Sequence, residues 1–122
     1  MMWIAVGVGG ALGSMARHWV NLVMGHRLER AVPNATFVVN VIGCLVIGAL
    51  AGQIAAGRLQ LTPQMRTFVF VGLLGGFTTF SSFGLDTFTL AHGGDHARAF
   101  WNVAGQMVLG LGAVSLGFYL AL

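Results

Sequence analysis

Hydrophobic residues run in four long stretches that short polar segments separate. The stretches cover about residues 2–24, 36–56, 67–90 and 99–122. Each supplies about 20 mostly apolar residues, the length that a helix needs to cross the hydrocarbon core of a bilayer. The pattern therefore predicts an all-α integral membrane protein, with four transmembrane helices in one domain of residues 1–122.

The third stretch differs from the others in its middle. Residues 75–83 read GGFTTFSSF, so adjacent glycines precede a cluster of hydroxyl and aromatic side chains. Glycines weaken a helix, and Thr or Ser side chains offer the backbone other hydrogen-bond partners. We predict a break, with the first half of the helix ending near Gly75 and the second beginning near Ser81. At membrane depth, broken backbone commonly forms ion or substrate sites, although a kinked packing helix is the alternative.

Two other stretches carry polar pairs at helical spacing. Thr36 and Asn40 are four residues apart in the second stretch, and Asn102 and Gln106 are four apart in the fourth. Residues at this spacing lie on one face of a helix. An amide inside a membrane span is costly unless it bonds a neighbouring helix or water. The pairs are therefore either links between helices or the polar lining of a path.

The first stretch has a face of small residues that ends near an arginine. Gly9 and Gly13 are four apart, as are Gly10 and Ser14, which favours close contact between helices. Arg17 lies about two turns before the end of this stretch. Its side chain either reaches the lipid headgroups or faces a watery vestibule.

Composition and charge exclude several classes of protein. Hydrophobic residues make up 57% of the chain and charged residues only 7%, far below the quarter that is usual in soluble domains. The net charge of +3 comes from six scattered arginines, which form no patch for nucleic acid. The three acidic residues, Glu29, Asp86 and Asp95, offer no catalytic pair inside the membrane, so we expect no enzyme. A single cysteine, Cys44, excludes a disulfide framework.

The predicted break supplies groups of two kinds. Carbonyls from Gly75 to Thr78 lack helical partners and could coordinate a small cation such as Na⁺. Phe80 and Phe83 are three apart, on one face of the second half. The edge of an aromatic ring is electropositive, so these rings could face an anion. Simple packing of the two rings is the alternative.

These residues resemble the motifs of one family. Residues 75–83 resemble the GGxTTFSTF signature of the CrcB/Fluc family of fluoride channels. Residues 9–13 with Arg17 resemble its first-helix pattern GGxxGAxxR, and residues 36–43 resemble its second-helix pattern TxxVNxxG. The resemblance extends through all four stretches.

The resemblance implies a particular assembly and a particular set of site residues. Two copies would pair antiparallel into a dual-topology homodimer with two fluoride pores and a central, structural Na⁺. Backbone carbonyls of Gly75 and Thr78 from both subunits would hold that Na⁺. The rings of Phe80 and Phe83 would contact fluoride, and Asn40 would orient them and donate along the pore. The remaining implied positions are polar lining at Thr36, Thr79 and Ser81, Arg17 in the aqueous vestibule, and an acidic position at Asp86.

The fourth helix departs from the family pattern. The family often presents a Tyr and a Ser four residues apart on the pore side, where this chain has Asn102 and Gln106. Both amides still form hydrogen bonds, so we predict that they line the path. The arginines at the two ends of the spans are nearly balanced, which fixes orientation only weakly and suits insertion in both directions.

The predicted function is a passive, fluoride-selective channel that exports cytoplasmic fluoride across the cell (inner or plasma) membrane. Its expected partners are fluoride, a second copy of the chain and the lipid bilayer, with no nucleic acid. A proton- or Na⁺-coupled carrier is the first alternative, although no carboxylate or His lies in the pore segments. A membrane assembly subunit that transports nothing is the second.

Overall fold

The structure is a computed structural model that describes residues 1–25 and 34–122. All the secondary structure within these ranges is helical, which confirms the predicted all-α class. The predicted loop with Arg27 and Arg30 lies outside the described residues. The elements are α1 (Met2–Met24), α2 (Ala35–Ala55), α3 (Pro63–Arg66), the π-helix η2 (Thr67–Leu74), α4 (Gly75–Phe77), α5 (Phe80–His92) and α6 (His96–Ala121).

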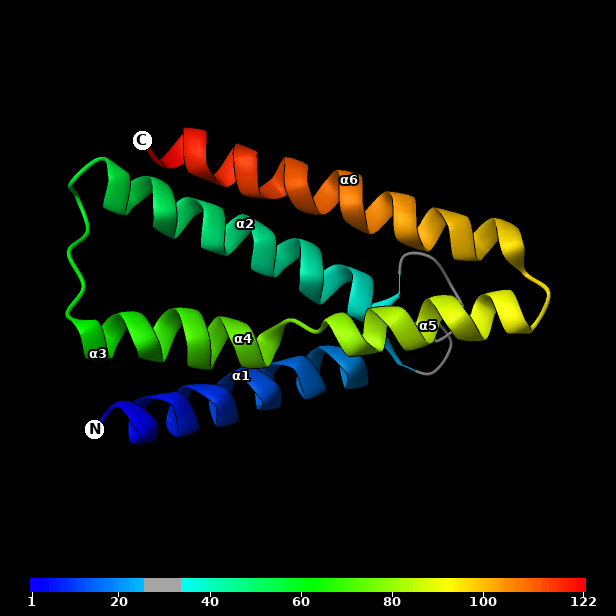
Figure 1. The fold of residues 1–122 in the computed structure, drawn as a ribbon, viewed down its shortest axis with the longest axis horizontal. Coiled ribbons are helices and arrows are strands. Elements are labelled where there is room, and N and C mark those ends of the chain that lie inside the picture. Colours follow the sequence, from blue (N-terminus) through cyan, green and yellow to red (C-terminus); the bar gives the residue numbers. More distant parts are fainter. Residues whose placement is uncertain (26–33) are drawn as a thin grey trace.

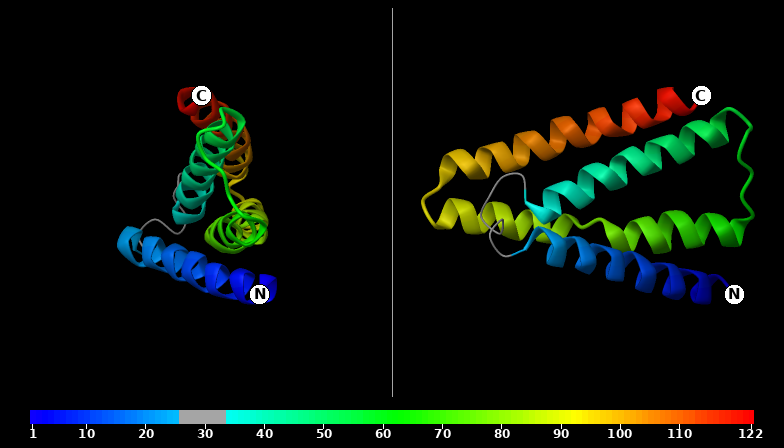
Figure 2. Two further views of the ribbon diagram at one scale, coloured as in Figure 1. Left: turned by 90° about the vertical axis from the view of Figure 1, so that its left-hand side faces the viewer. Right: turned by 180° about the vertical axis from the view of Figure 1, so that it is seen from behind.

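Long helices run roughly side by side along the molecule. α6 and α2 form one side, α3 to α5 follow one another along a single line, and α1 lies on the other side (Figure 1). The N-terminus, the C-terminus and the connection from α2 to α3 lie at one end. The turn between α5 and α6 lies at the other end. The end view in Figure 2 separates α1 from the α2 and α6 pair.

Three helical stretches in the described part of the chain are long and apolar enough to cross a membrane. They are Ala35–Ala55, the combined stretch Pro63–His92, and His96–Ala121. Helix α1 forms over the predicted residues but is not one of the three. Arg17, His18 and Asn21 lie in its last two turns and lower its mean hydropathy. Its crossing of the membrane, and so the count of four spans, stays a prediction.

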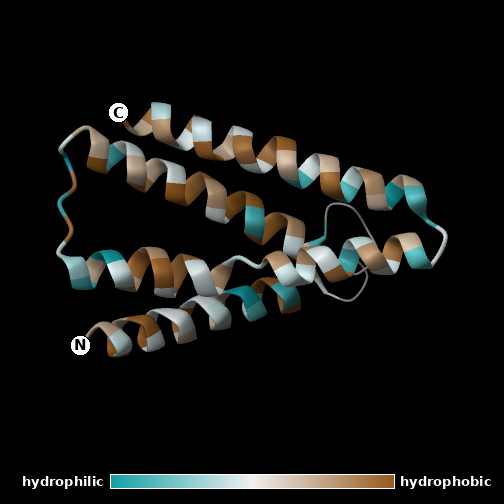
Figure 3. Cartoon of the chain, in the orientation of Figure 1, coloured by the Kyte–Doolittle hydropathy of each residue, from teal (hydrophilic) through white to brown (hydrophobic). Residues whose placement is uncertain are grey.

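The burial pattern is the reverse of that in a soluble protein. Large apolar side chains cover the outside, with Trp3 88% exposed and Phe80 81% exposed, whereas Asn102 is fully buried. Figure 3 shows hydrophobic residues along all the long helices, with hydrophilic ones in the connection from α2 to α3 and in the last turns of α1. A chain that exposes such apolar faces is suited to lipid contact.

Glycines let the helices approach until backbone meets backbone. A Cβ at Gly9 would lie 2.6 Å from the Phe68 carbonyl oxygen, and one at Gly76 would lie 2.7 Å from the Gly10 carbonyl oxygen. These glycines join α1 to η2 and α4. Gly48 and Gly117 pair α2 with α6 in the same way, since a Cβ at Gly48 would collide with the Val114 carbonyl oxygen. The close contact predicted for the small-residue face of α1 is confirmed at Gly9.

The interruption of the helix lies within the predicted segment and is shorter than it. Gly75 and Gly76 are helical and belong to α4, which ends at Phe77. Thr78 and Thr79 are extended, with ψ angles of 161° and 126°, and α5 begins at Phe80. The first half therefore ends two residues after Gly75, and the second begins one residue before Ser81. The glycines serve contact with α1, and the two threonines form the interruption.

Each helix after a connection begins with a polar cap. Asn34 accepts a hydrogen bond from the Phe37 amide at 2.9 Å at the start of α2. Thr79 accepts one from the Ser82 amide at 3.2 Å at the start of α5. Asp95 accepts one from the Arg98 amide at 3.2 Å, so α6 begins at His96 rather than Ala99. These side chains satisfy donors that the first turn of a helix leaves free.

Candidate functional site

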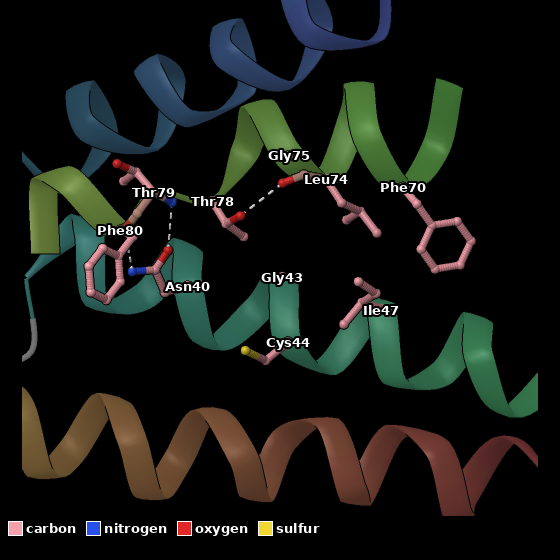
Figure 4. Close-up of a pocket in the computed structure, with 10 residues that line it drawn as sticks. All are labelled: Asn40, Gly43, Cys44, Ile47, Phe70, Leu74, Gly75, Thr78, Thr79 and Phe80. Atoms are coloured by element: carbon pink, nitrogen blue, oxygen red, sulfur yellow. Dashed lines mark hydrogen bonds between the residues drawn. The ribbon is translucent and has the colours of Figure 1, made fainter. Parts of the chain in front are cut away.

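A pocket of about 320 Å³ opens beside the interruption, between α2 and the η2–α4 segment (Figure 4). Its lining is mainly apolar, with amide and hydroxyl groups at one end. The lining residues are Asn40, Gly43, Cys44, Ile47, Phe70, Leu74, Gly75, Thr78, Thr79 and Phe80. The pocket therefore brings together residues of the predicted cation site and of the predicted anion path.

Asn40 pairs with both backbone groups of Thr79. Its Oδ1 accepts from the Thr79 amide at 2.9 Å, and its Nδ2 donates to the Thr79 carbonyl at 3.0 Å. Figure 4 shows the Asn40 side chain reaching from α2 toward this residue. Extended backbone inside a membrane protein needs partners for its N–H and C=O groups. The Asn40 amide supplies both, as a neighbouring strand would.

Asn40 also begins a line of amides that crosses to α6 and α5. Its Nδ2 donates to Gln106 Oε1 at 2.8 Å, and Gln106 Nε2 donates to Asn102 Oδ1 at 3.1 Å. Asn102 Nδ2 donates to Thr87 Oγ1 at 2.9 Å, and that hydroxyl donates to the Phe83 carbonyl at 2.9 Å. The amides at 102 and 106 are buried, so the geometry links them to each other and to their neighbours inside the subunit. Their lining role stays a prediction.

The two predicted ring residues lie at the start of α5. Their ring centroids are 5.6 Å apart and the ring planes meet at 53°. Phe80 is 81% exposed, whereas Phe83 is half-buried. Ser81 is exposed between them, and its hydroxyl lies 3.4 Å from the Thr79 hydroxyl. The exposed ring of Phe80 and the exposed Ser81 thus lie beside the interruption, on the outside of the described subunit.

The interruption removes helical partners from nearby carbonyls. The Thr79 amide would bond the Gly75 carbonyl in a continuing helix, but it donates to Asn40. The Ser82 amide would bond the Thr78 carbonyl, but it donates to the Thr79 hydroxyl. Neutral carbonyl oxygens of this kind are suitable ligands for hard cations. Among the described residues, no group of three or more His, Cys, Asp or Glu side chains could hold a metal.

A second polar cluster joins the start of α2 to α5. Asn34 Nδ2 donates to Asp86 Oδ2 at 3.1 Å. Thr36 and Asn40 are four residues apart on α2, as predicted, but Thr36 does not line the pocket. The Asp86 carboxylate is thereby held by a neutral amide near the N-terminus of α2, where negative charge is favourable.

Sequence reasoning missed three contributors to this site. Asn34 and Thr87 carry hydrogen bonds of the two clusters. Asn34 could have been indicated as a helix cap before the second stretch, and Thr87 as a polar residue inside the third. Gly43 makes room for Thr78, because a Cβ at position 43 would collide with the Thr78 methyl group. Arg17 is half-buried on α1 and does not line the pocket. Cys44 is half-buried and lines the pocket.

Comparison with known proteins gives one consistent result. The family described as "CrcB-like protein, Camphor Resistance (CrcB)" matches residues 4–118. A protein of Methylobacillus flagellatus named "Fluoride-specific ion channel FluC" is 47% identical over 116 residues, covering 94% of this chain and 90% of its own. A protein of the same name from Paracoccus denitrificans is 47% identical with the same coverage. A third, from Rhodospirillum centenum, is 44% identical and covers 98% of this chain and 94% of its own.

The relatives' names also bear on the class of the protein. They describe ion channels, which are not enzymes, so the exclusion of an enzyme is confirmed. The match runs from the first turn of α1 to the last turn of α6. Because the family match and these relatives span nearly the whole sequence, the chain belongs to the CrcB-like family.

Proposed function

We propose that this protein is a passive, fluoride-selective channel that lets cytoplasmic fluoride leave the cell across the cell membrane. The observation that carries the proposal is the 47% identity, over nearly the full length, to proteins named fluoride-specific ion channels. The geometry beside the interruption agrees with an anion path. Aromatic rings, hydroxyls and amides gather there, and the Asp86 carboxylate accepts a hydrogen bond from Asn34.

Fluoride holds its water tightly, so its path must replace that water with other groups. Ring edges of Phe80 and Phe83 present partial positive charge without a full counter-charge. The hydroxyls of Thr36, Thr79 and Ser81 supply further contacts, and Arg17 attracts anions to the vestibule. Several weak contacts of this kind let an ion enter a narrow path and leave it again. Asn40 contributes mainly by holding Thr79, since its amide already bonds that residue and Gln106.

The working unit in this proposal is an antiparallel, dual-topology homodimer. The combined stretch Pro63–His92 crosses the membrane as one interrupted span, with α1 as a fourth crossing helix. Each subunit offers carbonyl oxygens at Gly75 and Thr78 that a continuing helix would have used. A Na⁺ bound between two copies would take these neutral oxygens and tie the interruptions together. The exposed ring of Phe80 and the open pocket beside it are suited to contact with a second copy.

Fluoride efflux from liposomes tests the channel. Protein reconstituted into vesicles loaded with potassium fluoride is expected to release fluoride once valinomycin allows compensating K⁺ movement, with no proton or Na⁺ gradient present. A dependence of efflux on a proton or Na⁺ gradient would instead support a coupled carrier. Complete absence of flux from folded protein would support an assembly subunit that transports nothing.

The ring residues provide a sharper test within the same assay. We expect Phe80→Ile and Phe83→Ile each to lower fluoride flux by about tenfold or more, because isoleucine fills space but has no electropositive edge. Size-exclusion chromatography should show an unchanged assembly for both variants. Phe88→Ile is the matched control, since Phe88 is an exposed phenylalanine of α5 that stacks on His92. Near-normal flux in both test variants would remove the rings from the path.

A further inference from the structure

The hydrogen bonds that start at Thr79 form one continuous chain, called the circuit below, in which each group donates to the next and the last acceptor lies on α5. The Thr79 amide donates to Asn40, Asn40 to Gln106, and Gln106 to Asn102. Asn102 then donates to Thr87, which donates to the carbonyl of Phe83. The circuit leaves α5 just before its first residue, passes through α2 and α6, and returns to α5 one turn later. It therefore ties down the backbone that carries both predicted ring residues.

The backbone groups at the two ends of this circuit, at Thr79 and at Phe83, require the same orientation of every amide between them. The Thr79 amide can only donate, so the Asn40 oxygen must face it and the Asn40 nitrogen must face Gln106. The Gln106 oxygen then accepts, which turns its nitrogen toward Asn102. By the same step the Asn102 nitrogen faces Thr87. Turning any one amide over would place two donors or two acceptors against each other.

Burial makes the inner members of the circuit costly to disturb. Asn102 is fully buried and Gln106 is only 8% exposed, and no described buried side-chain N or O atom lacks a partner. A donor or acceptor that loses its partner in such surroundings keeps the full cost of its lost hydration. Head-to-tail hydrogen bonds also polarise one another, so removal of one link weakens the next.

We infer that Gln106 and Asn102 are positioning residues: they fix the amide of Asn40 so that it holds the extended Thr79 backbone, and with it the start of α5. The claim that this orientation sets fluoride flux rests on the proposed function. The claim that Gln106 orients Asn40 does not. In this chain the two α6 amides therefore act through Asn40 and Thr87, not by contact with the ion.

Gln106→Met is the central variant, because methionine keeps the length of the side chain but cannot accept from Asn40. Two readouts are needed: hydrogen exchange of the Thr79 amide by NMR in lipid nanodiscs, and fluoride efflux from liposomes. We expect Thr79 exchange to become about tenfold faster, which corresponds to the loss of one hydrogen bond. Fluoride flux should fall by about the same factor. The Phe37 amide, which donates to Asn34 on the same helix, should exchange at the wild-type rate.

Gln53→Met is the matched control variant. Gln53 Nε2 donates to the Ala121 carbonyl at 2.8 Å, so it also links α2 to α6 through a glutamine, far from the interruption. Arg58 Nη1 donates to the same carbonyl at 2.9 Å, which leaves that oxygen bonded in the variant. We expect wild-type Thr79 exchange and wild-type flux. An effect as large as that of Gln106→Met would show general loosening of the helix pair and overturn the inference.

Thr87→Val tests the far end of the circuit and serves also if Gln106→Met does not fold. Valine has nearly the same shape as threonine but cannot accept from Asn102. We expect Thr79 exchange to rise by about two- to threefold, since the lost bond is three links away and acts through polarisation. Unchanged Thr79 exchange in both circuit variants overturns the inference. So does a loss of flux with unchanged exchange, because Gln106 would then act on the ion directly.

The two readouts separate this inference from the proposed function. Absence of fluoride flux in the wild-type protein would end the proposed function, whereas Thr79 exchange would still decide whether Gln106 orients Asn40. Faster exchange with unchanged flux would keep the circuit but overturn its role in conduction.

Discussion

Replacing Asn40 by aspartate is expected to lower fluoride flux by about a hundredfold or more. The variant keeps an acceptor for the Thr79 amide but loses the Nδ2 donor, so the Thr79 carbonyl and the Gln106 oxygen face a carboxylate. The Thr79 carbonyl and Gln106 Oε1 then lose their donor, and both acceptors face a carboxylate oxygen that can only accept. A negative charge within about 4 Å of a passing anion costs about 4 kcal/mol at an effective dielectric constant of about 20. The lost hydrogen bonds and the charge repulsion both lower the flux.

Gln53→Glu is the control for this substitution. It makes the same change from amide to carboxylate on the same helix, at a site that bonds the Ala121 carbonyl instead of the interruption. We expect its flux to stay within about twofold of wild type, because 13 helical residues, about 20 Å, separate Gln53 from Asn40, which is more than a Debye length. Liposome efflux measures both variants. Near-normal flux through Asn40→Asp would show that the ion does not pass close to Asn40 and that the Thr79 backbone does not depend on its amide.

Gly13→Ala is expected to destabilise the fold by about 2–3 kcal/mol. Gly13 is buried where α1 meets η2 and α4, and a Cβ there would collide with the Leu73 carbonyl oxygen and lie 2.9 Å from the Phe77 nitrogen. Both neighbours are backbone atoms, so neither can move away as the end of a flexible side chain would. The added methyl group therefore forces α1 away from the segment that leads into the interruption. Reversible unfolding in detergent measures the loss.

Gly7→Ala makes the same change on the same helix, but we do not expect it to lower the free energy of unfolding. A Cβ at Gly7 would meet nothing within 4 Å. Alanine is favoured over glycine in a helix by about 1 kcal/mol, so this variant should be as stable as wild type or slightly more stable. Equal unfolding midpoints for the two variants would mean that α1 is not packed against η2 and α4 through its glycines.

The helices themselves could be predicted from the sequence to within a few residues. The first stretch forms a helix over the predicted residues, and α2 begins one residue before its predicted start. Long apolar stretches leave the backbone few alternatives, since a membrane supplies no partners for free N–H and C=O groups. The π-helical geometry of η2 was not predicted, because the apolar run 67–74 gives no local signal for it.

The ends of the interruption could not be predicted, because glycine is used in two ways. Gly75 and Gly76 were expected to break the helix, but they continue it, and Gly76 allows contact with Gly10 of α1. Helix propensity treats glycine as a weak helix former whether it ends a helix or allows contact with another helix. Only the presence of α1 against that surface decides that a small residue is needed there. The extended pair Thr78 and Thr79 is in turn stabilised by Asn40, which is 39 residues away from Thr79.

Composition and residue spacing were enough to predict the class of the protein, the approximate extent of its helices and the run of residues 75–83 at which the third stretch changes character. These features follow from composition and spacing, which act within one segment. Tertiary structure alone decided what the polar residues contact. Asn102 and Gln106 share a helix face by their spacing, but only the packing of α6 against α2 and α5 turns that face toward Asn40 and Thr87. A hydrogen bond needs a partner at about 3 Å, and that partner comes from another segment of the chain.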